Sequence, residues 1–233
     1  ILLQVCTLTK LIKHFLKRRC IIMDLWIFDN DGTLYDDSET HKNFMEIFSE
    51  YSSKLLGVPI QEVSAQLVKL KNKWNTGFPV IALMKEFGID YSEIVDNTYL
   101  KINLEKCNVP KYDHVRKKAL DNILADKVVF TNNPSVFARK VLLHLGLDRC
   151  FSDFVGMEEA CFFGKPDIRA FKALEFRHQG YTRIIFCDDS LKNLEVAHQI
   201  GWITVWYRPL IVDVKTGGKH LVVNSFNGIE RLL

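Results

Sequence analysis

Acidic and polar residues directly follow three short apolar runs, and each run is typical of a buried strand. Asp29 and Asp31 follow Asp24–Phe28, Thr131 and Asn132 follow Lys127–Phe130, and Asp188 and Asp189 follow Arg183–Cys187. Two carboxylates that face one site can carry out general acid–base chemistry. Adjacent carboxylates such as Asp188 and Asp189 repel each other unless a cation compensates their charge, and a hard cation with oxygen ligands does this well. The competing interpretation of this pair is an acidic helix N-terminus.

The segments around these clusters alternate between strand and helix patterns. Further strands are predicted at Trp202–Trp206 and, more weakly, at Phe154–Val155 and Leu221–Val223; helices are predicted at Pro134–Leu145 and Ser190–Ile200, ended by Gly146 and Gly201. Such alternation predicts an α/β fold whose parallel sheet is flanked by helices on both faces. Because ligands bind beyond the carboxyl ends of strands in such sheets, we expect the three clusters to converge on one site.

Residues 38–113, between the first and second of these strands, have a helical pattern. Helices are expected from Ser38 or Asp37 to Gly57, and at Gln61–Trp74, Val80–Phe87 and Ser92–Lys106. A helical module inserted after the first strand suggests a cap over the site. The predicted organisation is therefore a core of residues 23–37 and 114–233, a small all-helical cap of residues 38–113, and a basic leader of residues 1–22 outside the fold.

Composition and charge exclude several classes of protein. The apolar fraction of 48% and the charged fraction of 25% are those of an ordinary globular protein. The apolar runs are far shorter than the roughly 20 residues that a membrane span needs. Residues 1–22 hold five Lys or Arg and no acid, so the net charge of +3 leaves −2 for the remainder. We therefore expect neither a nucleic acid polymer nor a membrane as a partner.

The basic leader has three interpretations. A secretory signal is disfavoured, because its charges would precede the apolar stretch and here the apolar residues come first. The leader could be an amphipathic presequence, with Leu2, Val5 and Leu8 among the residues on its apolar face. The preferred interpretation is an extension that precedes a natural start at Met23. The six cysteines form no CxxC pair, which indicates free thiols and a reducing compartment, and we expect a cytoplasmic location. No pattern indicates an oligomeric state.

The segment Phe28-Asp29-Asn30-Asp31-Gly32-Thr33-Leu34 resembles the signature of the haloacid dehalogenase (HAD) superfamily. Three more motifs follow in the order that the family has: Thr131, then Gly164-Lys165-Pro166-Asp167, then Asp188-Asp189-Ser190 with Asn193. The resemblance spans nearly all of Met23–Pro209. It implies a Rossmann-like core with a cap and a phosphohydrolase activity.

The resemblance also implies a role for each motif residue. Asp29 is the nucleophile and Asp31 the general acid and base. Gly32 lets the backbone approach the phosphoryl group, and Thr33 supports the loop. The hydroxyl of Thr131 and the backbone of Asn132 hold a phosphoryl oxygen, and Lys165 neutralises charge on the nucleophile and on the phosphoryl group.

The resemblance implies Mg²⁺ as the cofactor, held by Asp29, by the carbonyl of Asp31 and by the pair Asp188 and Asp189. Asp189 is the preferred direct ligand, with Asp188 behind it. Asn193 is expected to help orient Lys165.

The presence of Asp31 favours phosphoryl transfer, because dehalogenases of the superfamily lack this acid. We expect hydrolysis of a small phosphorylated metabolite, with a phosphomutase or a non-catalytic binding module as alternatives. Tyr35 and the later motifs resemble pyrimidine 5′-nucleotidase-like members, which favours a nucleoside 5′-monophosphate, whereas Gly32 is shared with phosphoglycolate phosphatase-like members. A sugar phosphate is a further candidate. Lys71, Lys73, Trp74 and His41 are more simply interpreted as surface residues than as contacts to a substrate.

Overall fold

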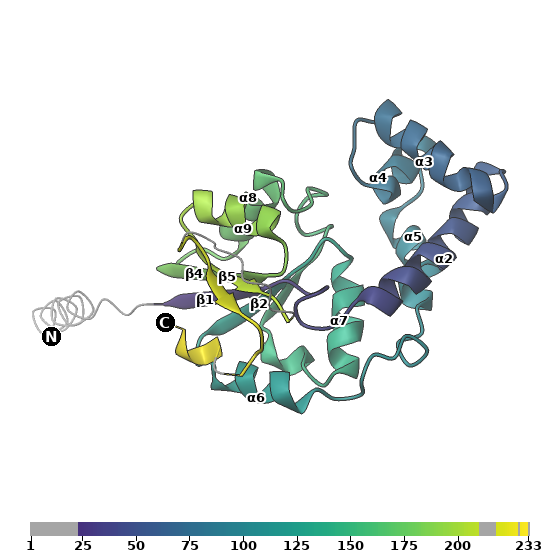
Figure 1. The fold of residues 1–233 in the computed structure, drawn as a ribbon. Coiled ribbons are helices and arrows are strands. Elements are labelled where there is room, and N and C mark those ends of the chain that lie inside the picture. The colour runs from purple at the N-terminus through teal and green to yellow at the C-terminus, as the bar shows by residue number, and fades with distance from the viewer. Residues whose placement is uncertain (1–22, 210–217, 228, 233) are drawn as a thin grey trace, which may run out of the picture.

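The computed structural model describes residues 23–209, 218–227 and 229–232, so the predicted leader at 1–22 lies outside the described residues. Six parallel strands form one sheet in the order β3-β2-β1-β4-β5-β6 (Figure 1). The strands are β1 (Asp24–Phe28), β2 (Asp126–Phe130), β3 (Asp153–Val155), β4 (Arg183–Asp188), β5 (Ile203–Tyr207) and β6 (Leu221–Val223). All six lie within one residue of their predicted bounds, and the predicted α/β class is confirmed.

Helices cover both faces of this sheet, because alternate residues of each strand point to opposite sides. The helices are α6 (His114–Asn122), α7 (Ser135–His144), α8 (Ile168–Arg177) and α9 (Leu191–Gln199). Trp26 and Phe28 of β1 pack in a core cluster with residues of α6 and α7, whereas Leu25 and Ile27 pack with residues of α8 and α9. Burial on both faces explains why the strands are apolar throughout.

The strand order reverses between β1 and β4. From β1 the chain continues to β2 and β3 on one side, and from β4 it continues to β5 and β6 on the other. The connections that leave β1 and β4 therefore diverge and open a crevice at the carboxyl ends of these two strands. Two of the three predicted polar clusters follow β1 and β4.

Residues 38–113, the helical segment, project away from the sheet (Figure 1). The segment contains α2 (Ser38–Leu56), α3 (Ile60–Lys73), α4 (Pro79–Phe87), α5 (Tyr91–Asn97) and a 3₁₀ turn, η1 (Tyr99–Lys101). It has its own apolar cluster, formed by Phe48, Val63, Leu67, Val80, Leu83 and Ile94. Within the segment, Tyr99 stacks on Phe44 with ring centroids 4.3 Å apart. Tyr99 also contacts Phe137 of α7, with ring centroids 5.5 Å apart, and this contact joins the segment to the core. The domain boundaries at 38 and 113 stay a prediction.

The helix expected at Ser92–Lys106 is wrong beyond Asn97, where α5 ends. The hydroxyl of Thr98 donates to the carbonyl of Ile94 at 2.6 Å, and the residue leaves the helical conformation with φ −128° and ψ −83°. After η1, the side chain of Asn103 accepts hydrogen bonds from the two amides of residues 105 and 106. Both side chains compete with helical bonding for backbone groups. Within the described ranges, no helix is long and apolar enough to cross a membrane.

Candidate active site

The ammonium group of Lys165 lies at the crevice between β1 and β4. It donates to Oδ1 of Asp29 at 2.7 Å, to the carbonyl of Phe130 at 2.7 Å and to Oδ2 of Asp188 at 2.9 Å. The side chains of Lys165, Asp29 and Asp188 are all buried. Burial alone would lower the pKa of Lys165, but the charges of Asp188 and Asp29 raise it above its usual value. The lysine therefore stays charged and links the ends of three strands.

Asp29 sits where β1 ends. Its amide donates to the carbonyl of Cys187 at 2.9 Å, which continues the bonding between β1 and β4 and fixes the direction of the side chain. Oδ2 receives a long hydrogen bond of 3.4 Å from the hydroxyl of Thr33. Burial raises the pKa of Asp29 well above its usual value, and the charge of Lys165 lowers it only in part. The charge of Lys165 therefore offsets only part of the cost of ionising Asp29.

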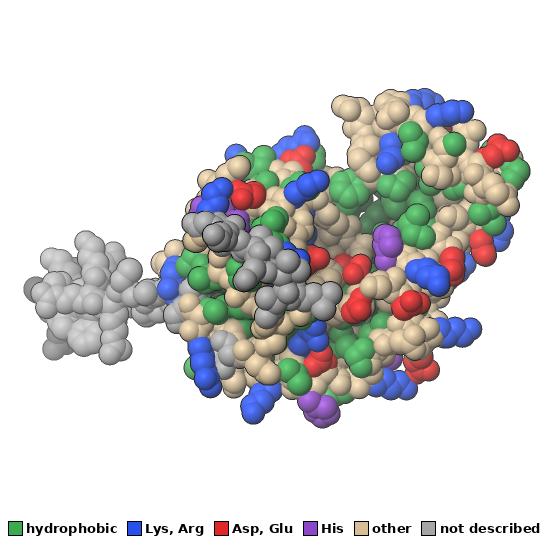
Figure 2. Space-filling model, in the orientation of Figure 1, with side chains coloured by type: hydrophobic (Ala, Val, Ile, Leu, Met, Phe, Trp, Pro, Cys, Tyr) green, Lys and Arg blue, Asp and Glu red, His purple; other side chains and the backbone are tan. Residues whose placement is uncertain are grey.

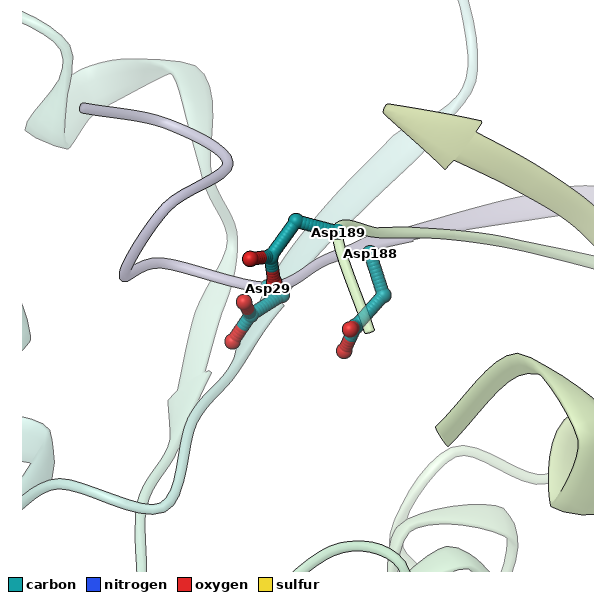
Figure 3. Close-up of side chains that lie close together, drawn as sticks. All are labelled: Asp29, Asp188 and Asp189. Carbon is teal, nitrogen blue, oxygen red and sulfur yellow. The ribbon is translucent and has the colours of Figure 1, made fainter. Parts of the chain in front are cut away.

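Three carboxylates gather at this point, from Asp29 after β1 and from Asp188 and Asp189 at the end of β4 (Figure 3). One oxygen of each lies within 4.8 Å of the others. Burial and the charge of Asp188 raise the pKa of Asp189 to about 6. Three converging oxygen donors whose charge is not compensated fit a hard divalent cation. The side chain of Asp31 is not part of this group; only the backbone carbonyl of this residue was predicted to bind the metal.

Asp188 is fully buried and its oxygens are bonded to protein. Oδ1 accepts from the amide of Ser190 at 2.7 Å, and both oxygens accept from the side-chain amide of Asn193 at 3.0 Å. Asn193 thus reaches Lys165 through Asp188, by orienting the carboxylate that the lysine contacts. Asp189 is exposed, and its place as the direct ligand stays a prediction.

Gly32 allows the loop after β1 to pass Asp189. Its φ is 76°, a left-handed conformation that glycine adopts without strain, and a Cβ here would lie 2.7 Å from Oδ2 of Asp189. The glycine therefore lets the backbone next to Asp31 approach the acidic group.

Asp31 directs its carboxylate toward Thr131 and Tyr35. Oδ2 accepts from the hydroxyl of Thr131 at 2.9 Å, and Oδ1 accepts from the hydroxyl of Tyr35 at 2.8 Å. The Tyr35 hydroxyl also lies 3.1 Å from that of Thr40, at the start of α2. Sequence reasoning did not identify Tyr35 as a site residue. The available signal was its spacing, because Tyr35 lies four positions after Asp31 in a loop that folds back on itself.

Asn132 has a second contribution that its sequence position did not reveal. Its side-chain nitrogen donates to the carbonyl of Lys165 at 2.9 Å, and its side-chain oxygen accepts from the amide of Lys165 at 2.6 Å. This pair of hydrogen bonds ties the loop after β2 to the loop that carries the lysine. The predicted role of the Asn132 backbone in binding a phosphoryl oxygen stays a prediction.

The residues weighed as contacts from the helical segment fall into two groups. Lys73 and Trp74 both bind Glu86, at 2.7 Å, within the segment. A cavity lies beside Asp31, between the helical segment and the sheet. Its lining includes His41, which is also exposed, but does not include Lys71, Lys73 or Trp74.

Comparisons with known proteins identify the family and the fold of this chain. The family model described as haloacid dehalogenase-like hydrolase matches residues 23–201. A HAD phosphatase from Thermococcus onnurineus is 16% identical, with a TM-score of 0.58 over 90% of this chain and 97% of that one. The L-2-haloacid dehalogenase from Xanthobacter autotrophicus with chloropropionic acid covalently bound is 14% identical, with a TM-score of 0.55 over 90% of this chain and 98% of that one.

A third similar structure is the HAD-hydrolase YfnB from Bacillus subtilis bound to magnesium. It is 16% identical, with a TM-score of 0.52 over 91% of this chain and 98% of that one. At these identities the three structures show a shared fold. The family match includes every predicted site residue from Asp29 to Asn193, and the chain belongs to the haloacid dehalogenase-like hydrolases.

Proposed function

We propose that this chain is a magnesium-dependent phosphatase that hydrolyses a small phosphomonoester through an aspartyl phosphate on Asp29. The observation that carries this proposal is the carboxylate of Asp31, held by Thr131 and Tyr35 two residues after Asp29. An alkoxide that leaves phosphorus needs a proton, whereas a halide leaves without one. Asp31 therefore favours phosphoryl transfer, although a dehalogenase is among the similar structures.

The chemistry needs one nucleophile and one proton carrier. Oδ1 of Asp29 is held by Lys165, so Oδ2 is the freer oxygen to attack phosphorus. As the P–O bond to the alcohol breaks, Asp31 gives its proton to the leaving oxygen. Water then attacks the phosphorus of the aspartyl phosphate and passes a proton to Asp31. The bond between phosphorus and the Asp29 oxygen breaks, which releases phosphate and regenerates Asp29.

Asp29, Asp188 and Asp189 would hold the magnesium ion, since they form the group of three oxygen donors. When bound, Mg²⁺ supplies positive charge that neutralises the phosphoryl group and the nucleophile. The magnesium in the B. subtilis structure supports this choice of metal.

The helical segment would act as a cap, because the cavity beside Asp31 lies between it and the sheet.

The direct test measures phosphate release from a panel of pyrimidine and purine monophosphates, phosphoglycolate and sugar phosphates, with Mg²⁺ and with a chelator. We expect release that requires Mg²⁺. A folded, magnesium-binding protein that releases no phosphate from the panel would instead indicate a phosphomutase or a binding protein.

The variant Gly32→Ala is expected to weaken Mg²⁺ binding about tenfold or more, because its Cβ would displace the carboxylate of Asp189. Alanine at a left-handed position should also lower the free energy of unfolding by about 1–2 kcal/mol. Calorimetric titration with Mg²⁺ and urea unfolding measure the two effects.

Gly57→Ala is the matched control for that variant. Gly57 has a similar φ of 65°, but no atom lies within 4 Å of the added Cβ. It should lose comparable stability and keep the wild-type affinity for Mg²⁺. Equal affinities in the two variants would show that Gly32 does not serve the metal site.

Tyr35→Phe is expected to lower kcat roughly tenfold with little change in KM, since a hydrogen bond to a charged group contributes about 1.5–3 kcal/mol. The hydroxyl orients Asp31 toward the leaving oxygen, so its loss should act on the chemical step. Tyr51→Phe is the control, because the Tyr51 hydroxyl is buried in the helical segment without a hydrogen-bond partner. If steady-state kinetics gave the same kcat for both variants, Tyr35 would have no positioning role.

A further inference from the structure

A cavity of about 260 Å³ lies beside Asp31, between the helical segment and the loops at the carboxyl end of the sheet. Figure 2 shows the hollow between these two parts, with hydrophobic side chains along it and acidic groups on the core side. Asn132 and Asp31 line the cavity next to the proposed phosphoryl site, so the cavity is placed to receive the other half of a bound ester.

Aromatic rings form much of the cavity wall. Phe44, Tyr99 and Phe137 line it side by side: Phe44 and Tyr99 are stacked with centroids 4.3 Å apart, and Phe137 is tilted against Tyr99 at 5.5 Å. Phe78, which precedes α4, reaches from the helical segment to the loop that carries Lys165. A Cβ on Gly164 would lie 2.1 Å from the ring tip of Phe78, so the absence of a side chain at Gly164 makes room for this ring. Flat rings in such a wall favour a flat apolar ligand.

The charge of the cavity is one-sided. The described residues that line the cavity include Asp31 and Asp37 but no Lys or Arg. Burial, together with the charge of Asp31, raises the pKa of Asp37. His41 is the remaining titratable group apart from the tyrosines on the described lining. A second anionic group on a ligand would lose its water here, gain no Lys or Arg partner and face two carboxyl groups.

We propose that this cavity binds an uncharged, ring-bearing alcohol portion of the phosphomonoester and rejects alcohols that carry a second anion. The inference rests on the proposed function, which places the phosphoryl group at Asp29. The volume is slightly below the roughly 300–1,000 Å³ typical of ligand pockets, which suits one ring or a small nucleoside. Aryl, benzyl and pyrimidine nucleoside phosphates belong to this class, whereas phosphoglycolate and sugar bisphosphates do not.

Binding of two phosphonates that cannot be hydrolysed tests the cavity without relying on turnover. Benzylphosphonate and 4-carboxybenzylphosphonate differ only in one carboxylate and are titrated calorimetrically into the full chain with Mg²⁺. Benzylphosphonate is expected to bind about tenfold tighter or more, because burying an unpaired charge is costly. Equal binding, tighter binding of the carboxylated compound, or no binding of benzylphosphonate would overturn the proposal.

Hydrolysis of the corresponding phosphates separates this inference from the proposed function. Benzyl phosphate hydrolysed in preference to 4-carboxybenzyl phosphate supports both. Equal hydrolysis of the two esters keeps the phosphatase and overturns the cavity assignment. Discrimination between the phosphonates without hydrolysis of either ester keeps the cavity assignment and overturns the phosphatase.

A charge placed on the cavity rim provides a second test. Met45 lines the cavity and is 46% exposed, so lysine can replace it without entering the core. Met45→Lys should improve binding of 4-carboxybenzylphosphonate relative to benzylphosphonate by about fivefold through charge attraction. Val68→Lys adds the same charge at a position with 48% exposure outside the cavity lining and should keep the wild-type ratio. An unchanged ratio in Met45→Lys would contradict the electrostatic basis of the selectivity.

Discussion

Asp29→Asn is expected to lower magnesium-dependent phosphate release by at least about 10⁴-fold, since the variant has no carboxylate to attack phosphorus. The substitution keeps the shape of the side chain, so the contacts of the loop after β1 should persist. Phosphate release is measured with saturating Mg²⁺ for wild type and variant. A variant that retained a tenth of the wild-type rate would exclude Asp29 as the nucleophile.

The same variant should remain folded, which separates catalysis from stability. Burial raises the pKa of Asp29, so its charged form is unfavourable in the native protein without metal. Asparagine removes that charge, and Lys165 keeps Asp188 as a partner. We expect thermal unfolding of the metal-free variant at the wild-type temperature or above it. Asp90→Asn, at an exposed residue whose side chain makes no cap hydrogen bond, is the control for both measurements.

Lys165→Met is expected to lower the free energy of unfolding by about 3–5 kcal/mol, because the loss of one partner leaves buried charges uncompensated. The ammonium holds Asp29 and Asp188 at 2.7 and 2.9 Å, and all three groups are buried. Methionine has a similar length and no charge, so packing is largely kept. Loss of this charge from the reacting groups should also lower kcat by about 10²–10³-fold.

Two further variants test the origin of that loss. Lys172→Met removes an exposed lysine of α8 and should change the free energy of unfolding by about 0.5 kcal/mol or less. The double variant Lys165→Met with Asp188→Asn removes both members of one ion pair and should recover part of the lost stability in urea unfolding. If Lys165→Met had the same free energy of unfolding as Lys172→Met, Lys165 would not stabilise the buried carboxylates of Asp29 and Asp188.

The strands and the general placement of the site could be predicted because they depend on local sequence patterns. Apolar runs such as Arg183–Cys187 are characteristic of strands buried on both faces, and polar residues at their ends converge once the strands are parallel. Lys165 and Asp29 are 136 residues apart and yet hydrogen-bonded, in agreement with the resemblance of the motifs. Gly57 and Gly201 mark helix ends through their left-handed conformations, at φ 65° and 88°.

What could not be predicted depends on contacts between loops. The hydrogen bonds from Asn132 to the backbone of Lys165 exist only because two loops meet, and no local pattern encodes that meeting. Helix α6 was not predicted because few of its residues are apolar and buried, namely Ala119 and Leu120. The end of α5 was placed too late because the apolar spacing continues past Thr98, whose hydroxyl bonds to the preceding turn.

The most direct test of the central claim is the covalent state of Asp29 during turnover. The protein is mixed with Mg²⁺ and a hydrolysed ester, quenched with acid, and treated with borohydride, which reduces an aspartyl phosphate to homoserine. Peptide mass spectrometry then examines the segment around Asp29. The mechanism proposed above predicts homoserine at position 29 and none in Asp29→Asn; an unmodified Asp29 in a sample that is releasing phosphate, with the modification at another residue or at none, would contradict it.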